Sequence, residues 1–477
     1  MEVWRNLKML WLLLVLLGVQ TEAINPGIKV KITKKGLDYG KQVGMKFLKS
    51  TLMKMPIPDY KGTQRVPIMG TMTYSMTGVQ IKDISFGESS IVLVPSSKLN
   101  LSVGPTDVEV QGDWSMKVSF IHDNEKINLK LKGMMLNAVV EVGWNATRRL
   151  SLSLANCRFQ TKSVDINFQG RSSWMYKLFI GSAKNSIRQA LDSKACDGIR
   201  KVIATLERKL HEVPEYSHIN SLADFDYSIV AAPVITNNSI EVDFKSEFYS
   251  ALDHLEAPES PAPFSLPELT DRMLVLGVSD FVPNTAALIY YRAGALSWNL
   301  TDSKIPQSFA TRLNTGSFKS FAPELQKQFP NTPVVLKIFA RHPPRVWTQS
   351  GSLHLMFPGA VQAFVQPKRS SEVPVFLLHV DANITAQVFV SGKNIGANLT
   401  MTDCGLSLVH SEVKNFSVNK LKNLMDVALK SAILPQINRK FNKGYPLPTL
   451  FNTSLHDPVI NIQEGFLTIA TDILYGA

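Results

Sequence analysis

The chain has 477 residues and a formal net charge of +12. An even spread of this charge would indicate only solubility, but residues 24–230 hold 29 Lys and Arg against 18 Asp and Glu, whereas residues 231–477 hold 20 against 19. This skew predicts an anionic partner, which is nucleic acid, a sulfated glycan or an anionic lipid surface. After residue 23 no stretch approaches the roughly 18 uninterrupted apolar residues of a membrane-spanning helix, which excludes a helical membrane protein.

The first 23 residues have the organisation of a secretory signal peptide. Arg5 and Lys8 precede the apolar run Met9–Leu17, and small residues occupy the positions before a cleavage site after Ala23. The apolar run is too short to span a membrane. We therefore expect the mature chain to be exported, which argues against a nucleic-acid partner.

The densest basic segment opens the mature chain. Lys29–Lys54 contains eight lysines against the single acid Asp38, and we interpret it as a helix. Two interpretations of its charge stay open: a solvated helix face, or a surface that attracts an anionic partner. Gly36, Gly40 and Gly44 recur at four-residue spacing and clear one face of this helix. That face either packs closely on a sheet or borders a groove for an acyl chain.

Apolar and polar residues alternate from residue 80 onward, which predicts long antiparallel strands with one buried face. The alternating positions lie in Leu99–Val103, Val108–Val110, Met116–Phe120, Ile127–Leu131 and Val140–Trp144. We expect turns at Gly104-Pro105 and Asp123-Asn124. Helical spacing then replaces the alternation over Ile187–Leu210, which predicts a long amphipathic helix that ends before Pro214.

The plan repeats in the second half. Ser250–Pro267 contains four prolines and has no apolar period, so it is predicted to be an extended, semi-rigid linker. A short helix near Asn284–Ala293 and a helix with apolar positions from Val418 to Ile433 flank a set of strands. These strands are predicted at Gly294–Leu300, Val334–Ala340, Leu353–Phe357, Val375–Val380 and Ala386–Val390. Two copies of one α+β unit in an elongated molecule account for the length.

Motifs that carry catalytic chemistry are missing from the sequence. It contains no Gly-x-Ser-x-Gly, phosphate loop, dinucleotide fingerprint or His-Glu-x-x-His. His211-Glu212 comes nearest to the His-Glu-x-x-His motif, but it lacks the second His and is followed by Pro214. The nine histidines are dispersed, and none stands at metal-ligand spacing. We predict a protein without enzymatic activity, metal or cofactor.

Glycosylation acceptors and cysteines fit an exported chain. Three cysteines in an oxidising compartment indicate one disulfide and one free thiol. Pairing of Cys157 with Cys196 would join a strand to the long helix and leave Cys404 as a buried apolar thiol. The Asn-x-Ser/Thr acceptors are Asn100, Asn145, Asn237, Asn299, Asn383, Asn398, Asn415 and Asn452.

A set of short motifs is distributed over the whole mature chain. They are Ile24-Asn25-Pro26-Gly27, Lys35–Tyr39, Ile57–Tyr60, Glu247–Tyr249, Asp271–Met273, Ser279-Asp280 with Asn284–Ala286, and Lys443–Pro448. In these motifs and their order the chain resembles the family of bactericidal/permeability-increasing protein and lipopolysaccharide-binding protein. The resemblance implies a phospholipid, as ligand and not as cofactor, in an apolar pocket of each half, and places the disulfide of the family at Cys157 and Cys196.

The fold class implied by the resemblance is α+β. An elongated, two-domain boomerang is expected, with two pseudo-symmetric antiparallel barrels that each carry a long amphipathic helix and are joined by a central sheet. The signal peptide is placed at 1–23 and the cationic N-terminal barrel at 24–230. A central-sheet strand and the proline-rich linker follow at 231–270, and the C-terminal barrel at 271–477.

The resemblance also implies that a cationic tip of the N-terminal barrel binds the lipid A part of lipopolysaccharide. Phosphates require cationic side chains, and acyl chains require apolar surface. Where the family has a basic hairpin, this chain has Asp113-Trp114-Ser115, which predicts weaker killing of bacteria. The candidate binding residues are Lys61, Arg65, Lys117, Lys126, Lys130, Lys132, Arg158, Lys162 and Arg171. The candidate residues of the phospholipid pocket are Leu37, Val43, Phe47, Ile187, Leu191 and Ile199.

We expect a secreted, extracellular protein of innate defence that binds lipopolysaccharide on the Gram-negative outer membrane and kills bacteria or neutralises endotoxin. Storage in granules, and a host receptor engaged by the C-terminal half, are further candidates. The alternatives are transfer or presentation of lipopolysaccharide, and plasma phospholipid transfer. The skewed charge favours a bacterial surface. The cholesteryl ester carrier of the family ends in an amphipathic helix, whereas this chain ends in the alternating segment Phe466–Ile473.

Overall fold

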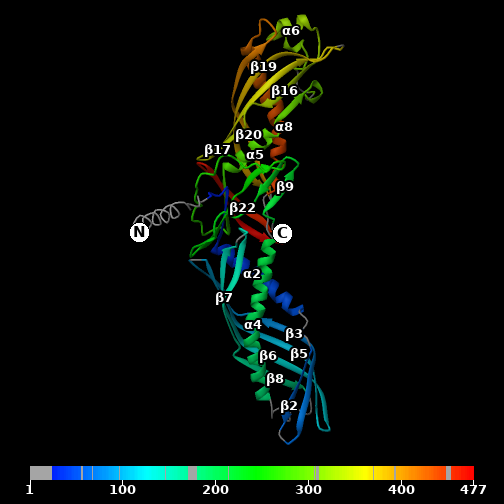
Figure 1. The fold of residues 1–477 in the computed structure, drawn as a ribbon, viewed down its shortest axis with the longest axis vertical. Helices are drawn as coiled ribbons and strands as arrows, with labels where there is room; N and C mark the ends of the chain where they lie inside the picture. The colour runs from blue at the N-terminus through cyan, green and yellow to red at the C-terminus, as the bar shows by residue number, and fades with distance from the viewer. Residues whose placement is uncertain are drawn as a thin grey trace, which may run out of the picture.

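The computed structural model describes residues 24–476, except 55–56, 58, 67, 96, 146, 170–179, 213, 306, 308–310, 369, 392–393 and 447–452. The predicted signal peptide, Arg171 and Asn452 lie outside the described residues. The molecule is elongated, with a seven-stranded sheet toward each end and a six-stranded sheet between them (Figure 1). The predicted α+β architecture of two similar units joined by a central sheet is confirmed.

The N-terminal sheet is built from long antiparallel strands whose alternate side chains are buried. Its order is β2-β3-β5-β6-β7, with β4 paired to β5 and β8 paired to β6. The strands are β2 (Tyr60–Val66), β3 (Gly70–Ser85), β4 (Ser89–Val94), β5 (Lys98–Val118), β6 (Ile121–Trp144), β7 (Leu150–Gln160) and β8 (Ser163–Gln169).

Both turns predicted in this sheet are wrong. Gly104-Pro105 lies inside β5, where the strand continues through a bulge in its pairing with β6. Gly104 has a φ of +137°, and a Cβ at this position would lie 2.6 Å from the carbonyl oxygen of Met134, so only glycine fits. Asp123-Asn124 lies inside β6, and the hairpin turns at Ser119-Phe120 instead. This turn lacks the usual Asn-Gly signal, and Phe120, predicted on the buried face, is exposed.

Two long helices accompany the N-terminal sheet. Helix α2 (Lys34–Lys54) packs on β3 and β4, and α4 (Ile180–His211) packs on β7 and β8 along the length of the sheet (Figure 1). The helix predicted over Ile187–Leu210 is thereby confirmed. The helix predicted over Lys29–Lys54 begins later, because Ile28–Thr33 forms strand β1. Among the described residues no helix has the length and apolar character needed to cross a bilayer.

The central sheet combines strands from the beginning, middle and end of the chain. Strand β1 lies between two strands that come more than 200 residues later, and it pairs with both in antiparallel register. In spatial order the sheet contains β11 (Val234–Ile235), β12 (Ser239–Phe244), β1, β14 (Leu274–Ser279), β23 (Phe466–Tyr475) and β22 (Thr453–Gln463). A smaller sheet beside it contains β13 (Glu247–Ser250), β10 (Ala223–Asp226) and β9 (Tyr216–Asn220).

The C-terminal half repeats the plan of a curved sheet with helices. Its strands are β15 (Ser297–Leu300), β16 (Val334–Ala340), β17 (Arg345–Gln349), β18 (Ser352–Val365), β19 (Val373–Ser391), β20 (Asn394–Ser411) and β21 (Tyr445–Pro446). Its helices are α5 (Phe281–Arg292), α6 (Pro323–Gln328), α7 (Val418–Ala428) and α8 (Leu434–Phe441). Shorter helical turns are η1 (Asp302–Lys304), η2 (Ser317–Ser320) and the π-helical η3 (Leu429–Ile433), which joins α7 to α8.

One strand replaces two predicted ones in this half. Val375–Val380 and Ala386–Val390 both belong to β19, because Ala382 and Ile384 continue the alternation through the polar segment between them. The predicted helix from Val418 to Ile433 is confirmed and continues through η3 into α8. The inner face of the sheet packs against a cluster of buried aromatic and aliphatic side chains, which forms the core of this half.

Strand β1 also carries charge into the interior. The Nζ atom of Lys29 lies 2.9 Å from Glu241 and 3.2 Å from Asp243, both on β12. Lys31, only 4% exposed, lies 2.9 Å from Glu268, which directly follows the proline-rich segment, and donates a hydrogen bond to the carbonyl oxygen of Leu266 within that segment. These two lysines therefore do not belong to a solvated helix face. They connect β1 to β12 and to the segment predicted as a linker, which packs on the central sheet through Leu266.

A half-buried lysine, Lys245, lies where the central and the smaller sheet meet. The Nζ atom of Lys245 is 3.4 Å from Asp226, 3.1 Å from Glu247 and 2.6 Å from Glu256. Burial lowers the pKa of Lys245, but the hydrogen bond to Glu256 and the charges of Glu247 and Asp226 outweigh burial and raise the pKa overall. The side chains of Asp226 and Glu247 are almost fully buried, so Lys245 is their counter-charge.

Replacement of Lys245 by methionine should destabilise the protein by about 3–5 kcal/mol, because two buried carboxylates would lose their partner. Since the folded-state pKa of Lys245 is raised, its contribution is complete below the unfolded value of 10.5 and is lost as the pH rises through the folded value. Urea unfolding should therefore show that the parent protein loses stability above pH 10.5 and that the variant loses less.

The matched control for this prediction is Lys430→Met, which removes an exposed ion pair between Lys430 and Asp426 on neighbouring helical turns. Such a pair contributes about 0.3–0.5 kcal/mol. Equal unfolding free energies for the two variants would contradict the role assigned to Lys245.

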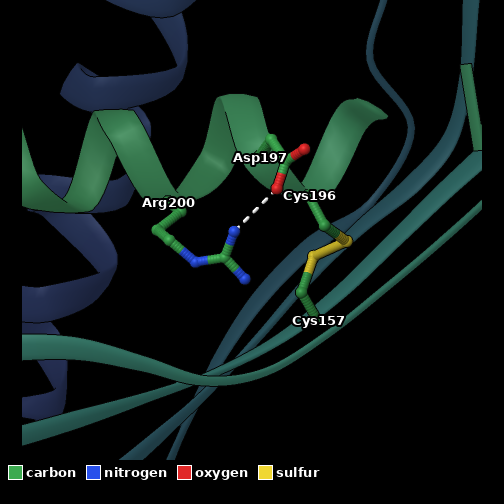
Figure 2. Close-up of a disulfide and its surroundings, with 4 residues drawn as sticks. All are labelled: Cys157, Cys196, Asp197 and Arg200. Carbon is green, nitrogen blue, oxygen red and sulfur yellow. Dashed lines mark hydrogen bonds and ion pairs between the residues drawn. A yellow bond between two sulfur atoms is a disulfide. The ribbon is translucent and has the colours of Figure 1, made fainter. Parts of the chain in front are cut away.

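A disulfide fixes α4 to the sheet. Cys157 of β7 and Cys196 of α4 are bonded, with a Cα–Cα distance of 5.8 Å, which confirms the pairing implied by the resemblance. Figure 2 shows the bond reaching from the helix to the strand, with the Asp197–Arg200 ion pair of 2.7 Å on the same helix. Cys404 is free and buried, as predicted, and burial raises the pKa of its thiol.

Loss of this disulfide should cost about 4 kcal/mol in the chain-entropy model, because the bond closes a loop of 39 residues. Cys157→Ala and Cys196→Ala should both lower the unfolding midpoint and the secreted yield. Cys404→Ala should cost about 1 kcal/mol, as an ordinary point change does. Thermal unfolding and secreted yield of the three variants test this, and a Cys404 variant as damaged as the others would contradict it.

Candidate functional site

The far end of the N-terminal sheet, at the bottom of Figure 1, carries the candidate site, which we call the tip. Two hairpins turn there: β2–β3 at Ile68-Met69 and β5–β6 at Ser119-Phe120. Because β3 pairs with both β2 and β5, the two turns lie at the same end of the sheet. Ile68 is 108% exposed and Phe120 is 88% exposed, more than any other large apolar side chain in the described residues.

The backbone at both turns is strained. Ile68 has a φ of 71° and Ser119 a φ of 52°, in the region that favours glycine. For a β-branched residue such as isoleucine this conformation is costly. Neither Ile68 nor Phe120 gains burial within the fold in return. The two turns therefore present the most exposed large apolar side chains of the described residues at one end of the molecule.

Three of the predicted cations lie on the exposed face beside these turns. Lys117 is two residues from the β5–β6 turn and pairs with Thr73 of β3. Arg65 pairs with Thr71 next to the β2–β3 turn, and Lys61 lies farther along β2. Since β2 and β5 are two strand spacings apart, the two sets of cations are separated by about 10 Å. Within the described residues none of the three forms an ion pair.

The three predicted cations of β6 are compensated by acids on neighbouring strands. The hydrogen bond to Glu109 raises the pKa of Lys130, and the hydrogen bond from Lys132 lowers the pKa of Asp165. These positions therefore add little net charge to the surface. The pairs are Lys126 with Asp113 at 2.5 Å, Lys130 with Glu109 at 2.5 Å, and Lys132 with Asp165 at 3.0 Å.

Among the described residues, the remaining predicted cations lie away from the tip. Lys132 is opposite Ser163 of β8, eleven residues into β6, which corresponds to about 35 Å from the turn. Lys162 precedes β8 at this level, and Arg158 lies on β7 beside the disulfide-bonded Cys157. The predicted set is therefore not one site. Only Lys61, Arg65 and Lys117 combine free charge with nearness to the turns.

Trp114, at the centre of the hairpin motif, points inward. Its ring is 9% exposed and stacks on Tyr74 at 5.1 Å between centroids, with Phe168 at 5.5 Å. Its neighbours Asp113 and Ser115 face solvent. The tryptophan thus supports the end of the sheet from inside, and its flanking positions face the same side as Lys117.

The predicted pocket residues are distributed over two clusters. Leu37 packs with side chains of the central sheet, whereas Ile187 and Leu191 pack on the inner face of the N-terminal sheet. Val43 and Ile199 are half-buried, and Phe47 is the exception at 66% exposed. Two further members of the apolar stripe predicted on α4, Val202 and Leu206, are exposed as well. Helices α2 and α4 therefore both keep apolar side chains outside the core.

No group of His, Cys, Asp and Glu side chains in the described part of the chain could hold a metal ion. The exposed predicted glycosylation acceptors are Asn100, Asn237, Asn299, Asn398 and Asn415, while Asn145 and Asn383 are half-buried.

Comparison with known proteins gives one consistent relationship. Two models of the LBP / BPI / CETP family match, the N-terminal domain over residues 36–206 and the C-terminal domain over residues 217–475. A bactericidal permeability-increasing protein of Sebastes schlegelii is 34% identical over 466 residues, which is 98% of each chain. A lipopolysaccharide-binding protein of Bos taurus is 30% identical over 452 residues, which is 94% of each chain. A crystal structure of lipopolysaccharide binding protein superposes with a TM-score of 0.62 at 27% identity, covering 95% of this chain and 100% of that one.

The ion pair at Asp113 generates a test of the tip. Asp113→Asn should free Lys126, which lies six residues beyond the β5–β6 turn, and one added lysine near an anionic surface contributes about 1 kcal/mol. Binding to phosphatidylglycerol vesicles at low salt should therefore strengthen by about fivefold. Asp165→Asn, which frees Lys132 far from the tip, is the control and should change binding little. Equal gains for both variants would show that overall charge, not the tip, governs binding.

Proposed function

The chain belongs to the LBP / BPI / CETP family, and from that membership we propose a secreted protein of innate defence that binds the lipid A part of lipopolysaccharide through the tip. Members of this family are lipid-binding proteins and not enzymes. The sequence, which lacks catalytic motifs, agrees with this.

The observation that carries the proposal is the combination of Ile68 and Phe120 with Arg65 and Lys117 at one end of the molecule. Lipid A is a phosphorylated amphiphile with several acyl chains. The guanidinium of Arg65 and the ammonium of Lys117 suit its phosphates, and the protruding apolar side chains suit its acyl region. Both kinds of contact would form at once when the tip meets an anionic membrane end-on.

A second lipid interaction belongs to the same proposal. Phe47 of α2 and Val202 and Leu206 of α4 are exposed apolar residues on the helices that accompany the N-terminal sheet. A phospholipid acyl chain lying between helix and sheet would cover such surface and recover about 25 cal/mol per Å² of apolar area. We therefore propose that the N-terminal half carries a bound phospholipid, which organic extraction and mass spectrometry would identify.

The small number of unpaired cations at the tip favours one kind of defence over the other. Asp113 and Ser115 flank Trp114, and acids compensate the lysines of β6. Disruption of a bacterial membrane by charge alone would use more free cations than the tip offers. We therefore propose that binding and neutralisation of endotoxin dominate over killing.

Two double variants test the tip. Ile68→Ser with Phe120→Ser should weaken binding to immobilised lipopolysaccharide at every salt concentration, by tenfold or more, because burial of each side chain contributes about 1.5–3 kcal/mol. Arg65→Ala with Lys117→Ala should weaken binding at low salt, and the difference from the parent protein should shrink as salt screens the charges.

Matched controls lie outside the tip. Leu252→Ser removes the next most exposed large apolar side chain of the described residues, at 78%, from the middle of the molecule. Arg158→Ala with Lys162→Ala removes two cations that lie away from the tip. Both should bind as the parent protein does. Retained binding by both tip variants would remove the basis of the proposal.

A further inference from the structure

The outer face of the C-terminal sheet has an open groove of about 380 Å³ with a mixed lining. Small-molecule sites have volumes of roughly 300–1,000 Å³, so the groove has room for a sugar ring. Two aromatic residues, Phe339 and Phe364, line it together with the polar residues Asn299, Lys337 and Gln362. The opposite face of the same strands packs in the core of this half, so the groove is separate from that core.

Strand register explains how these side chains come together. Asn299 of β15 pairs with Lys337 of β16, which pairs with Gln362 of β18, so the three form one row across the sheet. The ring of Phe364 lies 4.2 Å from the Nζ atom of Lys337, and Phe339 is 36% exposed. The row of polar side chains is thus bordered by exposed aromatic surface.

Asn299 begins the glycosylation motif Asn299-Leu300-Thr301 and opens directly onto this groove. Its backbone carbonyl accepts a hydrogen bond of 2.7 Å from Lys304, whereas its exposed side-chain amide has no hydrogen-bond partner within the described residues. Asn145 differs, because its side-chain oxygen accepts hydrogen bonds from Thr147 and Arg149. The backbone of Asn299 is therefore held by pairing with β16 and by Lys304, and its side-chain amide is available for modification.

We propose that Asn299 carries an N-linked glycan whose first N-acetylglucosamine lies in this groove. The bond forms between Nδ2 of Asn299 and C1 of the sugar, supplied by a polyprenyl-diphosphate-linked oligosaccharide. The amide loses one proton, and the polyprenyl diphosphate leaves. The C–H face of the sugar packs on the rings of Phe339 and Phe364, and Lys337 offers N–H donors to its oxygen atoms.

The glycan would have a structural role. Strand β15 is the edge of the C-terminal sheet, and an exposed edge beside apolar surface invites pairing with another chain. Trp298 on the same strand is 43% exposed. A sugar chain attached at Asn299 covers the groove and obstructs the approach of a second molecule to β15. The glycan requires that the chain passes through the secretory pathway, as the proposed function also does. It does not require lipopolysaccharide binding.

The test uses the full chain secreted from mammalian cells. Glycopeptide mass spectrometry should find Asn299 occupied in the parent protein and in Thr301→Ser, which keeps the motif, and unmodified in Asn299→Gln and Thr301→Ala. The two variants without the glycan should unfold about 2–4 °C lower and should self-associate with rising concentration in analytical ultracentrifugation. Thr301→Ser should match the parent protein in both measurements. This variant distinguishes the effect of losing the glycan from the effect of changing the side chain at position 301.

Asn398→Gln is the matched control, because Asn398 is an exposed acceptor on β20 that does not line the groove. Its loss should leave the midpoint and the oligomeric state unchanged. Enzymatic trimming to the first sugar should preserve the midpoint of the parent protein. The proposal would be overturned if Asn299 is unmodified while other acceptors are occupied. It would also be overturned if Asn299→Gln and Thr301→Ala behave as the parent protein does. Neither result would affect the function proposed for the tip. Whether the tip variants lose lipopolysaccharide binding tests the proposed function. That result does not test the glycan at Asn299.

Discussion

Charge compensation inside the central sheet is the constraint on which the connection of the two halves depends. Lys29 and Lys31 enter the sheet on β1, where they pair with carboxylates of β12 and with Glu268, which follows the proline-rich segment. Lys245 compensates the negative charges of Asp226 and Glu247. A lysine buried this deeply is compatible with folding only when paired, since an uncompensated charge costs several kcal/mol. The pairing thus fixes which segments meet at the centre, and the ends of the molecule extend from it.

The same compensation changes the meaning of the net charge. Of the eight lysines in Lys29–Lys54, five have acidic partners in the folded chain. The lysines of β6 are likewise paired across the sheet. An excess of +11 over residues 24–230 therefore overstates the charge that a ligand meets. Recognition at the tip depends on a few unpaired cations, and equally on two apolar side chains that a count of charge ignores.

Fold class, repeated plan and disulfide could be predicted, because alternation, helical spacing and ordered family motifs are local properties of the sequence. The tip could not. Alternation runs through Val118 into Phe120 without a Gly or Asn to mark the turn, so Phe120 resembled a core residue. The compensation of Lys126 by Asp113 depends on the register between β5 and β6, which the position of the turn at Ser119-Phe120 sets. Contacts across strands are set by pairing and cannot be read from one strand.

The position of β1 has a consequence for the order of synthesis. This strand leaves the ribosome first, yet its partners β12 and β14 come more than 200 residues later. At about 5–20 residues per second, β1 waits on the order of 10–50 s for its second neighbour. The N-terminal sheet is complete in sequence well before that time, whereas β22 and β23 arrive last of all. The central sheet is therefore completed after the described strands of both outer sheets have been synthesised.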